Sequence, residues 1–140
     1  MLVGDGGDAL EGGTGDDTLF GGEGDNLARG GDGTDWITGS TGEDTLAGVA
    51  ADWFEGGTGH DLFELPADRV AGLAPTTLAD FNAAGDRLEL VLPEAGIGAA
   101  QVTLDLQPDG SGLVRLNGAA VAHVLNAAGL EPAQIGLRVA

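Results

Sequence analysis

GGTGDDTLF at residues 12–20 and GGEGDNLAR at residues 21–29 are consecutive copies of one nine-residue pattern. The pattern continues in both directions without a gap. In register, the chain reads VGDGGDALE (3–11), GGTGDDTLF (12–20), GGEGDNLAR (21–29), GGDGTDWIT (30–38), GSTGEDTLA (39–47), GVAADWFE (48–55) and GGTGHDLFE (56–64). The sixth unit is one residue short. A fixed period over tandem units indicates a repeat architecture in which neighbouring units stack on one another.

Each position of the unit has its own character. Positions one, two and four are mostly glycine, which supplies positive φ and predicts a turn over the first six residues. Position six is an acid or its amide: Asp8, Asp17, Asn26, Asp35, Asp44, Asp52 and Asp61. Position eight is apolar: Leu10, Leu19, Ala28, Ile37, Leu46, Phe54 and Phe63. The alternation around position eight predicts a short strand over the last three residues.

A single large apolar side chain per unit cannot form a core alone, so the units must stack. Strands on opposite sides of a flattened coil require two units, or about 18 residues, per full turn, at the short strand lengths that these units allow. The position-eight side chains then fill the space between two parallel sheets. This arrangement predicts that each turn lies above the turn two units later.

The stacked turns bring the position-six side chains into columns. Carboxylates about 4.8 Å apart repel one another unless a cation lies between them. Calcium accepts 6–8 oxygen ligands, including main-chain carbonyls, whereas magnesium requires a tighter octahedron and retains its waters. The spacing therefore favours calcium at the turns.

The units match the pattern GGxGxDxUx, and residues 3–64 resemble the hemolysin-type, or RTX, calcium-binding nonapeptide repeat family. The resemblance implies an all-β fold with a parallel β-roll, Ca²⁺ shared by loops two repeats apart, and export by a type I secretion system. It implies Asp8, Asn26, Asp44 and Asp61 on one edge and Asp17, Asp35 and Asp52 on the other. The glycines that it implies as loop ligands are Gly13, Gly15, Gly22, Gly24, Gly31, Gly33, Gly42, Gly57 and Gly59.

Two departures from the pattern lower the expected number of ions. Asn26 is neutral, and the unit at 48–55 has lost a residue and two glycines. We therefore expect about three to five calcium ions, with affinities in or somewhat above the range of extracellular modules. The alternative is an acidic, glycine-rich linker, but a linker would not keep an apolar residue at every position eight. Without calcium, we expect residues 1–64 to be disordered.

Charge divides the chain into two regions, 1–64 and 65–140. The net charge is -18, and residues 1–64 hold 15 of the 23 acidic residues but one arginine, Arg29. Such a chain repels phosphate, so we expect neither nucleic acid nor anionic membranes as partners. No apolar run is long enough to span a bilayer, so we expect no membrane insertion. Residues 1–13 have neither the basic nor the apolar region of a secretory signal peptide, so we do not expect them to act as one. The chain has no cysteine and therefore no disulfide.

Residues 65–140 lose the period and are predicted to form a mostly antiparallel β cap over the open end of the roll. The sequence predicts strands within 76–92 around a turn at 82–85, three strands within 101–125, a helical turn within 126–135 and a strand at 136–139. The stretch LADFNAAGDRLEL resembles the DFxxGxDxIDL segment that follows such repeats. Its Asp80 and Asp86 either bind a further ion or fix the turn. The expected junction residues are Phe63, Leu65, Phe81 and Leu90.

The chain carries no catalytic motif. His60 and His123 share no spacing with a second soft ligand, Ser40 and Ser111 lie in no GxSxG elbow, and HExxH is absent. We therefore expect a non-enzymatic module that folds on calcium outside the cell and supports secretion of its parent protein. The secretion machinery and an N-terminal passenger domain are the expected partners, with IGLRVA at 135–140 compatible with an export signal.

Trp36 and Trp53 both occupy position seven, two units apart. They should face outward as neighbours on one sheet. Paired exposed aromatics could stack on a sugar, or contact the C-terminal half or a neighbouring domain. The alternative function is therefore a calcium-dependent polysaccharide-binding or adhesin module.

Overall fold

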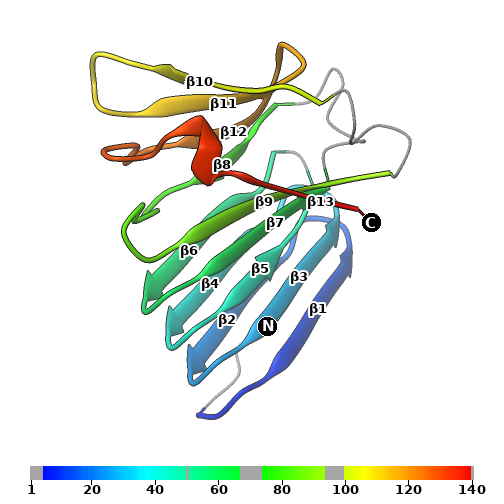
Figure 1. The fold of residues 1–140 in the computed structure, drawn as a ribbon. Coiled ribbons are helices and arrows are strands. Elements are labelled where there is room, and N and C mark those ends of the chain that lie inside the picture. Colours follow the sequence, from blue (N-terminus) through cyan, green and yellow to red (C-terminus); the bar gives the residue numbers. More distant parts are fainter. Residues whose placement is uncertain (1–4, 50, 67–73, 94–99, 140) are drawn as a thin grey trace.

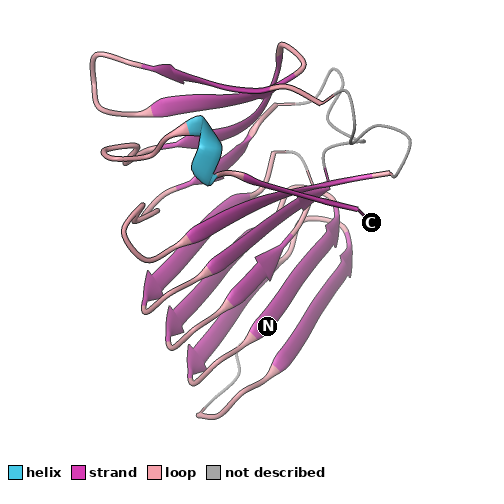
Figure 2. Ribbon diagram, in the orientation of Figure 1, coloured by secondary structure: helices cyan, strands magenta, loops and turns pink. Residues whose placement is uncertain are grey.

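The chain forms two β-sheets wound into a roll, as Figure 1 and Figure 2 show. The computed structural model describes residues 5–49, 51–66, 74–93 and 100–139. The only helix in these segments is one 3₁₀ turn, η2 (Pro132–Gln134). No helix in the described segments is long and apolar enough to span a membrane. The strands are β1 (Ala9–Thr14), β2 (Thr18–Glu23), β3 (Leu27–Asp32), β4 (Trp36–Thr41), β5 (Thr45–Ala47), β6 (Trp53–Thr58), β7 (Leu62–Pro66), β8 (Thr76–Leu78), β9 (Arg87–Leu92), β10 (Val102–Leu106), β11 (Gly112–Leu116), β12 (Ala119–Val124) and β13 (Gly136–Val139).

The strands of the repeats alternate between the two sheets. The first sheet, here the odd sheet, has the order β1-β3-β5-β7-β9-β13, and the even sheet has the order β10-β11-β12-β8-β6-β4-β2. Pairing within the repeats is parallel, with Leu10 opposite Ala28 and Ile37 opposite Phe54. The residues of the first pair are separated by one full coil, which contains two units. The residues of the second pair are one residue closer in the sequence, because the short unit lies between them. The predicted parallel β-roll is therefore confirmed.

The strands are longer than the sequence predicts. Most contain six residues, because each runs from position seven of one unit through position three of the next. The prediction of three-residue strands was wrong because glycines usually weaken strands, whereas here the parallel neighbour supplies their hydrogen bonds. Only β5 keeps three residues within the repeats, and the shortened unit follows it.

The core is a ladder of the position-eight side chains between the two sheets. All seven are buried, with exposed fractions of 1% or less. Aromatic rings close the ladder at its C-terminal end, where Phe54 lies 6.2 Å from Phe63 and Phe63 lies 5.8 Å from Phe81, measured between ring centroids. Ala28 is the smallest member, so the third unit contributes the smallest apolar side chain to the ladder.

The C-terminal strands extend the roll as well as cap it. β8 pairs in parallel with β6, and β9 and β13 continue the odd sheet in parallel beyond β7. β10, β11 and β12 are antiparallel and lie beyond β8 at the end of the even sheet (Figure 1). The predicted strands and turns of this half are present, and the expected junction residues are all buried: Phe63, Leu65, Phe81 and Leu90.

Candidate metal centre

The position-six side chains form two hydrogen-bonded columns, one along each edge of the roll. In each column the Oδ1 atom accepts the main-chain N–H of the position-six residue two units earlier, at 2.8–3.0 Å. One column contains Asp8, Asn26, Asp44 and Asp61, and the other contains Asp17, Asp35 and Asp52. This is the pairing that the nine-residue period predicts.

The second carboxylate oxygen is left without a donor at four of these positions. Within the described segments, the buried Oδ2 atoms without a hydrogen-bond partner are those of Asp17, Asp35, Asp44 and Asp61. Such oxygens are costly to bury, because they have lost water and gained neither a donor nor a counter-charge. They are the atoms of the turns that a bound cation would most directly satisfy.

Four of the position-six carboxyls have raised pKa values. Burial is the largest cause and raises the pKa of Asp61 to about 6 and that of Asp52 to about 7. The pKa values of Asp35 and Asp44 are also raised, first by burial and further by nearby carboxylates. Loss of water and like-charge repulsion both disfavour the ionised form. A bound cation would reverse this balance.

Glycine makes room for these oxygens. A Cβ atom on Gly12, at position one, would lie 2.8 Å from Oδ2 of Asp17, and Gly30, Gly39 and Gly56 face their own aspartates more closely still. The position-two glycines named above lie near the ends of the strands and the position-four glycines lie in the turns, and all have positive φ, from 95° to 140°. Side chains at Gly33 or Gly59 would collide with the carbonyl of the turn two units earlier. The turns therefore combine carboxylates with closely spaced main-chain carbonyls.

At two of the position-six residues, Asn26 and Asp52, the second polar atom of the side chain has a hydrogen-bond partner. The Asn26 amide Nδ2 donates to the Gly24 carbonyl at 2.9 Å, and a Cβ on Gly21 would meet this Nδ2, just as position-one glycines elsewhere meet Oδ2. The amide thus occupies the place of the orphaned oxygen. In the shortened unit, Oδ2 of Asp52 accepts the Val49 N–H at 2.8 Å. Neither position requires a cation for its hydrogen bonding.

The oxygen chemistry of the turns fits calcium. No three side chains of His, Cys, Asp or Glu converge on one point in the described part of the chain. A metal that requires several imidazole or thiolate ligands is therefore poorly matched. Calcium accepts main-chain carbonyls beside a few carboxylates, and this is the donor set that the turns provide.

Asp80 and Asp86 both contact the last repeat. Asp80 accepts the N–H groups of Gly56 and Gly57 at 2.8 and 2.7 Å. Asp86 accepts the N–H of Asp61 at 3.0 Å and that of Asn82 at 2.8 Å, so it extends the first column by one coil. Both oxygens of each carboxylate have donors, and these contacts match the alternative in which the pair fixes the turn.

Sequence reasoning missed a second set of stacked side chains at position five. Asp16 accepts the N–H of Thr34 at 3.0 Å, and Asp25 accepts the N–H of Glu43 at 2.8 Å, in each case from the turn two units later. The signal was present as acids at position five of consecutive units. These exposed carboxylates add negative charge beside the columns.

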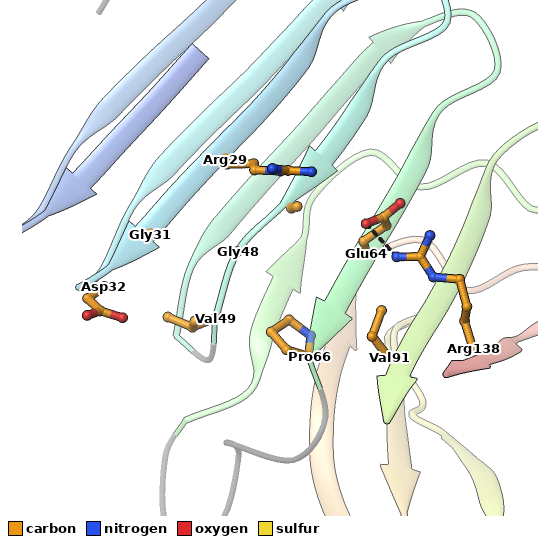
Figure 3. A pocket seen from close by; sticks show the side chains of 10 residues that line it. Arg29, Gly31, Asp32, Gly48, Val49, Glu64, Pro66, Val91 and Arg138 are labelled. Carbon is orange, nitrogen blue, oxygen red and sulfur yellow. Dashed lines mark hydrogen bonds and ion pairs between the residues drawn. The ribbon is translucent and has the colours of Figure 1, made fainter. Parts of the chain in front are cut away.

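An apolar groove lies elsewhere, on the outer face of the odd sheet (Figure 3). Its volume is about 290 Å³, and its lining includes Arg29, Val49, Pro66 and Arg138. Arg138 forms an ion pair with Glu64 at 2.8 Å, drawn as a dashed line in Figure 3. The groove holds two of the five basic residues of the chain, so it is not a cation site.

Comparison with known proteins supports the assignment of the repeats. Residues 2–34 and 29–63 match the profile of the RTX calcium-binding nonapeptide repeat, in four copies. The solution structure of the AlgE6R3 subunit from the Azotobacter vinelandii mannuronan C5-epimerase is similar, with a TM-score of 0.68 and 26% identity over 89% of this chain and 79% of that chain. The AlgE6R2 subunit shares the fold, with a TM-score of 0.57 and 23% identity over 96% and 90% of the two chains. No curated protein sequence matches the chain.

Proposed function

The chain is a calcium-binding module whose repeats at residues 2–63 belong to the RTX nonapeptide family, and from this premise we propose that it folds only when Ca²⁺ enters its turns outside the cell. The observation that carries the proposal is the set of four buried carboxylate oxygens without donors, on Asp17, Asp35, Asp44 and Asp61. A divalent ion supplies the positive charge that these oxygens lack.

The proposed ligands are the position-six carboxylates together with carbonyls of the glycine-rich turns. Asp17, Asp35, Asp44 and Asp61 are the principal candidates, because each has an orphaned oxygen. Asp8 lies at the exposed end of the column that contains Asp44 and Asp61. The Asn26 amide donates to Gly24 and Oδ2 of Asp52 accepts the Val49 N–H, so these two positions contribute weaker sites. We retain the expectation of about three to five ions, coordinated by oxygen alone.

Calcium binding and folding are coupled in this proposal. Residues 1–64 carry 15 acidic residues and one arginine, and the core receives one large side chain per unit. The ordered roll without ions combines repulsion with a small gain from apolar burial, so the extended chain is favoured. Ions that bind only the folded form shift the equilibrium toward it. A chain that stays extended in calcium-poor cytosol suits type I export, and the parent protein would fold after secretion.

We propose a binding module rather than an enzyme. The group that most resembles a catalytic triad is Asp109, Ser111 and His123, which line one pocket. The Ser111 hydroxyl, however, donates to Asp109 at 2.6 Å, and the Ser111 N–H donates to the same carboxylate. A nucleophilic serine would instead donate to an imidazole base. These contacts are those of a tight turn between β10 and β11.

A polysaccharide-binding role is the second candidate. The similar AlgE6R3 subunit comes from an enzyme named for its action on mannuronan, a polysaccharide, and the exposed Trp36 pairs with the half-buried Trp53 on the even sheet. This role is compatible with the first, because the roll must be folded to present the pair.

Calcium titration tests the folding proposal. Circular dichroism should change from a disordered to a β-rich spectrum as Ca²⁺ is added to chelator-treated protein, and calorimetry should report several bound ions. Asp35→Ala should lower the ion count, whereas Glu23→Gln, which removes an exposed position-three charge, should leave it unchanged. Identical spectra with and without calcium would rule the proposal out.

A further inference from the structure

An aromatic platform stands on the outer face of the even sheet. It consists of Phe20 on β2, Trp36 on β4 and Trp53 on β6. Trp36 is 47% exposed and Phe20 is 40% exposed, which is unusual for side chains of this size. Trp36 and Trp53 are register partners on adjacent strands, with ring centroids 5.6 Å apart and planes tilted by 38°.

The platform is held in place by the sheet. The Trp53 indole Nε1 donates to the Glu55 carboxylate at 2.9 Å, which fixes the orientation of that ring. Both tryptophans lie on strands paired on both sides, since β4 pairs with β2 and β6, and β6 pairs with β4 and β8. A ligand therefore meets rings that need little further ordering, which favours binding.

Polar groups surround the rings. Thr18 and Thr77 flank the tryptophan pair in register, and Thr38 lies opposite Phe20 and beside Glu55. The Thr38 hydroxyl oxygen is buried, so the accessible polar border is formed by Thr77 and the Glu55 carboxylate. A pyranose ring has an apolar C–H face and a rim of hydroxyls, so it complements an aromatic face with such a border. A protein partner would favour a broader apolar patch, and the other exposed large hydrophobics of the described segments lie on the C-terminal half: Leu106, Leu125 and Val139.

The charge of this face selects among sugars. The strands β2, β4 and β6 contain no arginine, lysine or histidine, and the basic residue of the repeats, Arg29, lies on β3 of the odd sheet. The basic side chain in register with the tryptophan row is His123 on β12, two strands from Trp53 across Thr77. A uronic acid stacked on the rings would therefore meet no arginine or lysine beside it and would approach a strongly acidic roll. A neutral sugar carries no such penalty.

We propose that the aromatic platform binds pyranose rings of a neutral polysaccharide, with one ring stacked on Trp36 and the adjoining unit against Trp53. The proposal rests on the calcium-folded roll described above and gives the second candidate function a site and a ligand class. The two tryptophan rings are one strand spacing apart, which is comparable to the length of one sugar unit, so consecutive units can engage both.

The experiment uses the whole chain, folded in calcium, with soluble glucomannan as the neutral probe and oligomannuronate as the charged one. Glucomannan should change the tryptophan emission in a saturable manner and bind in calorimetry. Trp36→Ala should weaken this binding at least about tenfold, a loss typical of one aromatic stacking contact. Trp36→Phe should retain part of the affinity, and Leu106→Ala, which truncates an exposed leucine on β10, should retain all of it.

The outcomes separate this proposal from the folding proposal. Calcium-induced folding without glucomannan binding, or binding that Trp36→Ala leaves unchanged, overturns the platform alone. Tighter binding of oligomannuronate than of glucomannan overturns the neutral ligand class. A dimer in calcium that Trp36→Ala converts to a monomer would show that the rings contact a second copy, and would also overturn the proposal. Absence of any calcium-dependent change in circular dichroism counts against the folding proposal.

Discussion

Asp35 holds the main chain of Asp17 with one carboxylate oxygen and leaves the other buried without a donor. Its Oδ1 accepts the Asp17 N–H at 2.8 Å, one full coil away, while Oδ2 has no partner in the described part of the chain. The same side chain therefore links two coils and creates a local need for positive charge. This relationship connects the stacking of the roll with its dependence on calcium.

Asp35→Asn should remove a calcium site and stabilise the metal-free roll. The new amide can donate to the Gly33 carbonyl, as the Asn26 amide donates to Gly24. Calorimetry should report fewer ions, and chelator-treated protein should show more β-structure than the native chain. An unchanged ion count would contradict the assignment of Asp35 as a ligand.

Asn26→Asp should have the opposite effect. It replaces a donor with an oxygen that nothing in the turn satisfies, and it adds a charge between Asp8 and Asp44. We expect lower stability in chelator and tighter or additional calcium binding, measured by thermal unfolding with and without Ca²⁺. Greater stability in chelator would show that the amide contact has no stabilising role.

Gly39→Ala should impair folding even in calcium. The added methyl would meet Oδ2 and Cγ of Asp44 and approach the Gly56 carbonyl at 2.6 Å, so either the column or the strand must shift. A loss of about 1–3 kcal/mol in the free energy of unfolding is expected from such overpacking. Thr41→Ala, at an exposed position two residues later, is the matched control and should be nearly neutral.

Acidification should favour the metal-free roll. Burial raises the pKa of Asp52 to about 7 and that of Asp61 to about 6, from 3.8. A carboxyl with a higher pKa in the folded state stabilises that state when protonated, so this contribution is complete below about pH 4 and is lost as the pH rises through 6 and 7. Chelator-treated protein should therefore gain β-structure between pH 8 and pH 5.

The same protonation should weaken calcium binding, because protons and calcium compete for the carboxylates. Calcium midpoints measured by circular dichroism should rise as the pH falls from 8 to 5. A calcium midpoint that stays constant between pH 8 and pH 5 would mean that the carboxyls with raised pKa values, those of Asp52 and Asp61, are not ligands.

The period of nine was sufficient to predict the winding, the core and the columns. The spacing of position eight predicts which side chains face inward, as Leu10 does. The spacing of position six predicts which turns stack on one another, as the turns of Asp8 and Asn26 do. Repetition makes these long-range contacts predictable, since each coil repeats the last.

The sequence did not predict the contacts that lie outside the nine-residue repeat or that depend on its interruption. The pairing of β13 with β9 joins segments far apart in a region without repeats, and no local pattern specifies it. The Val49 contact of Asp52 arises only because one residue is missing from that turn.

The shortened unit has an evolutionary consequence. Although a residue is missing from 48–55, Trp53 and Phe54 still pair with Trp36 and Ile37, because the turn absorbs the deletion before the strand begins. A deletion that is confined to a turn in this way does not change which side chains of the following strand face inward and which face outward. A turn can therefore be shortened in evolution without a change in the register of the position-eight side chains, so the number of candidate cation sites can vary independently of the core.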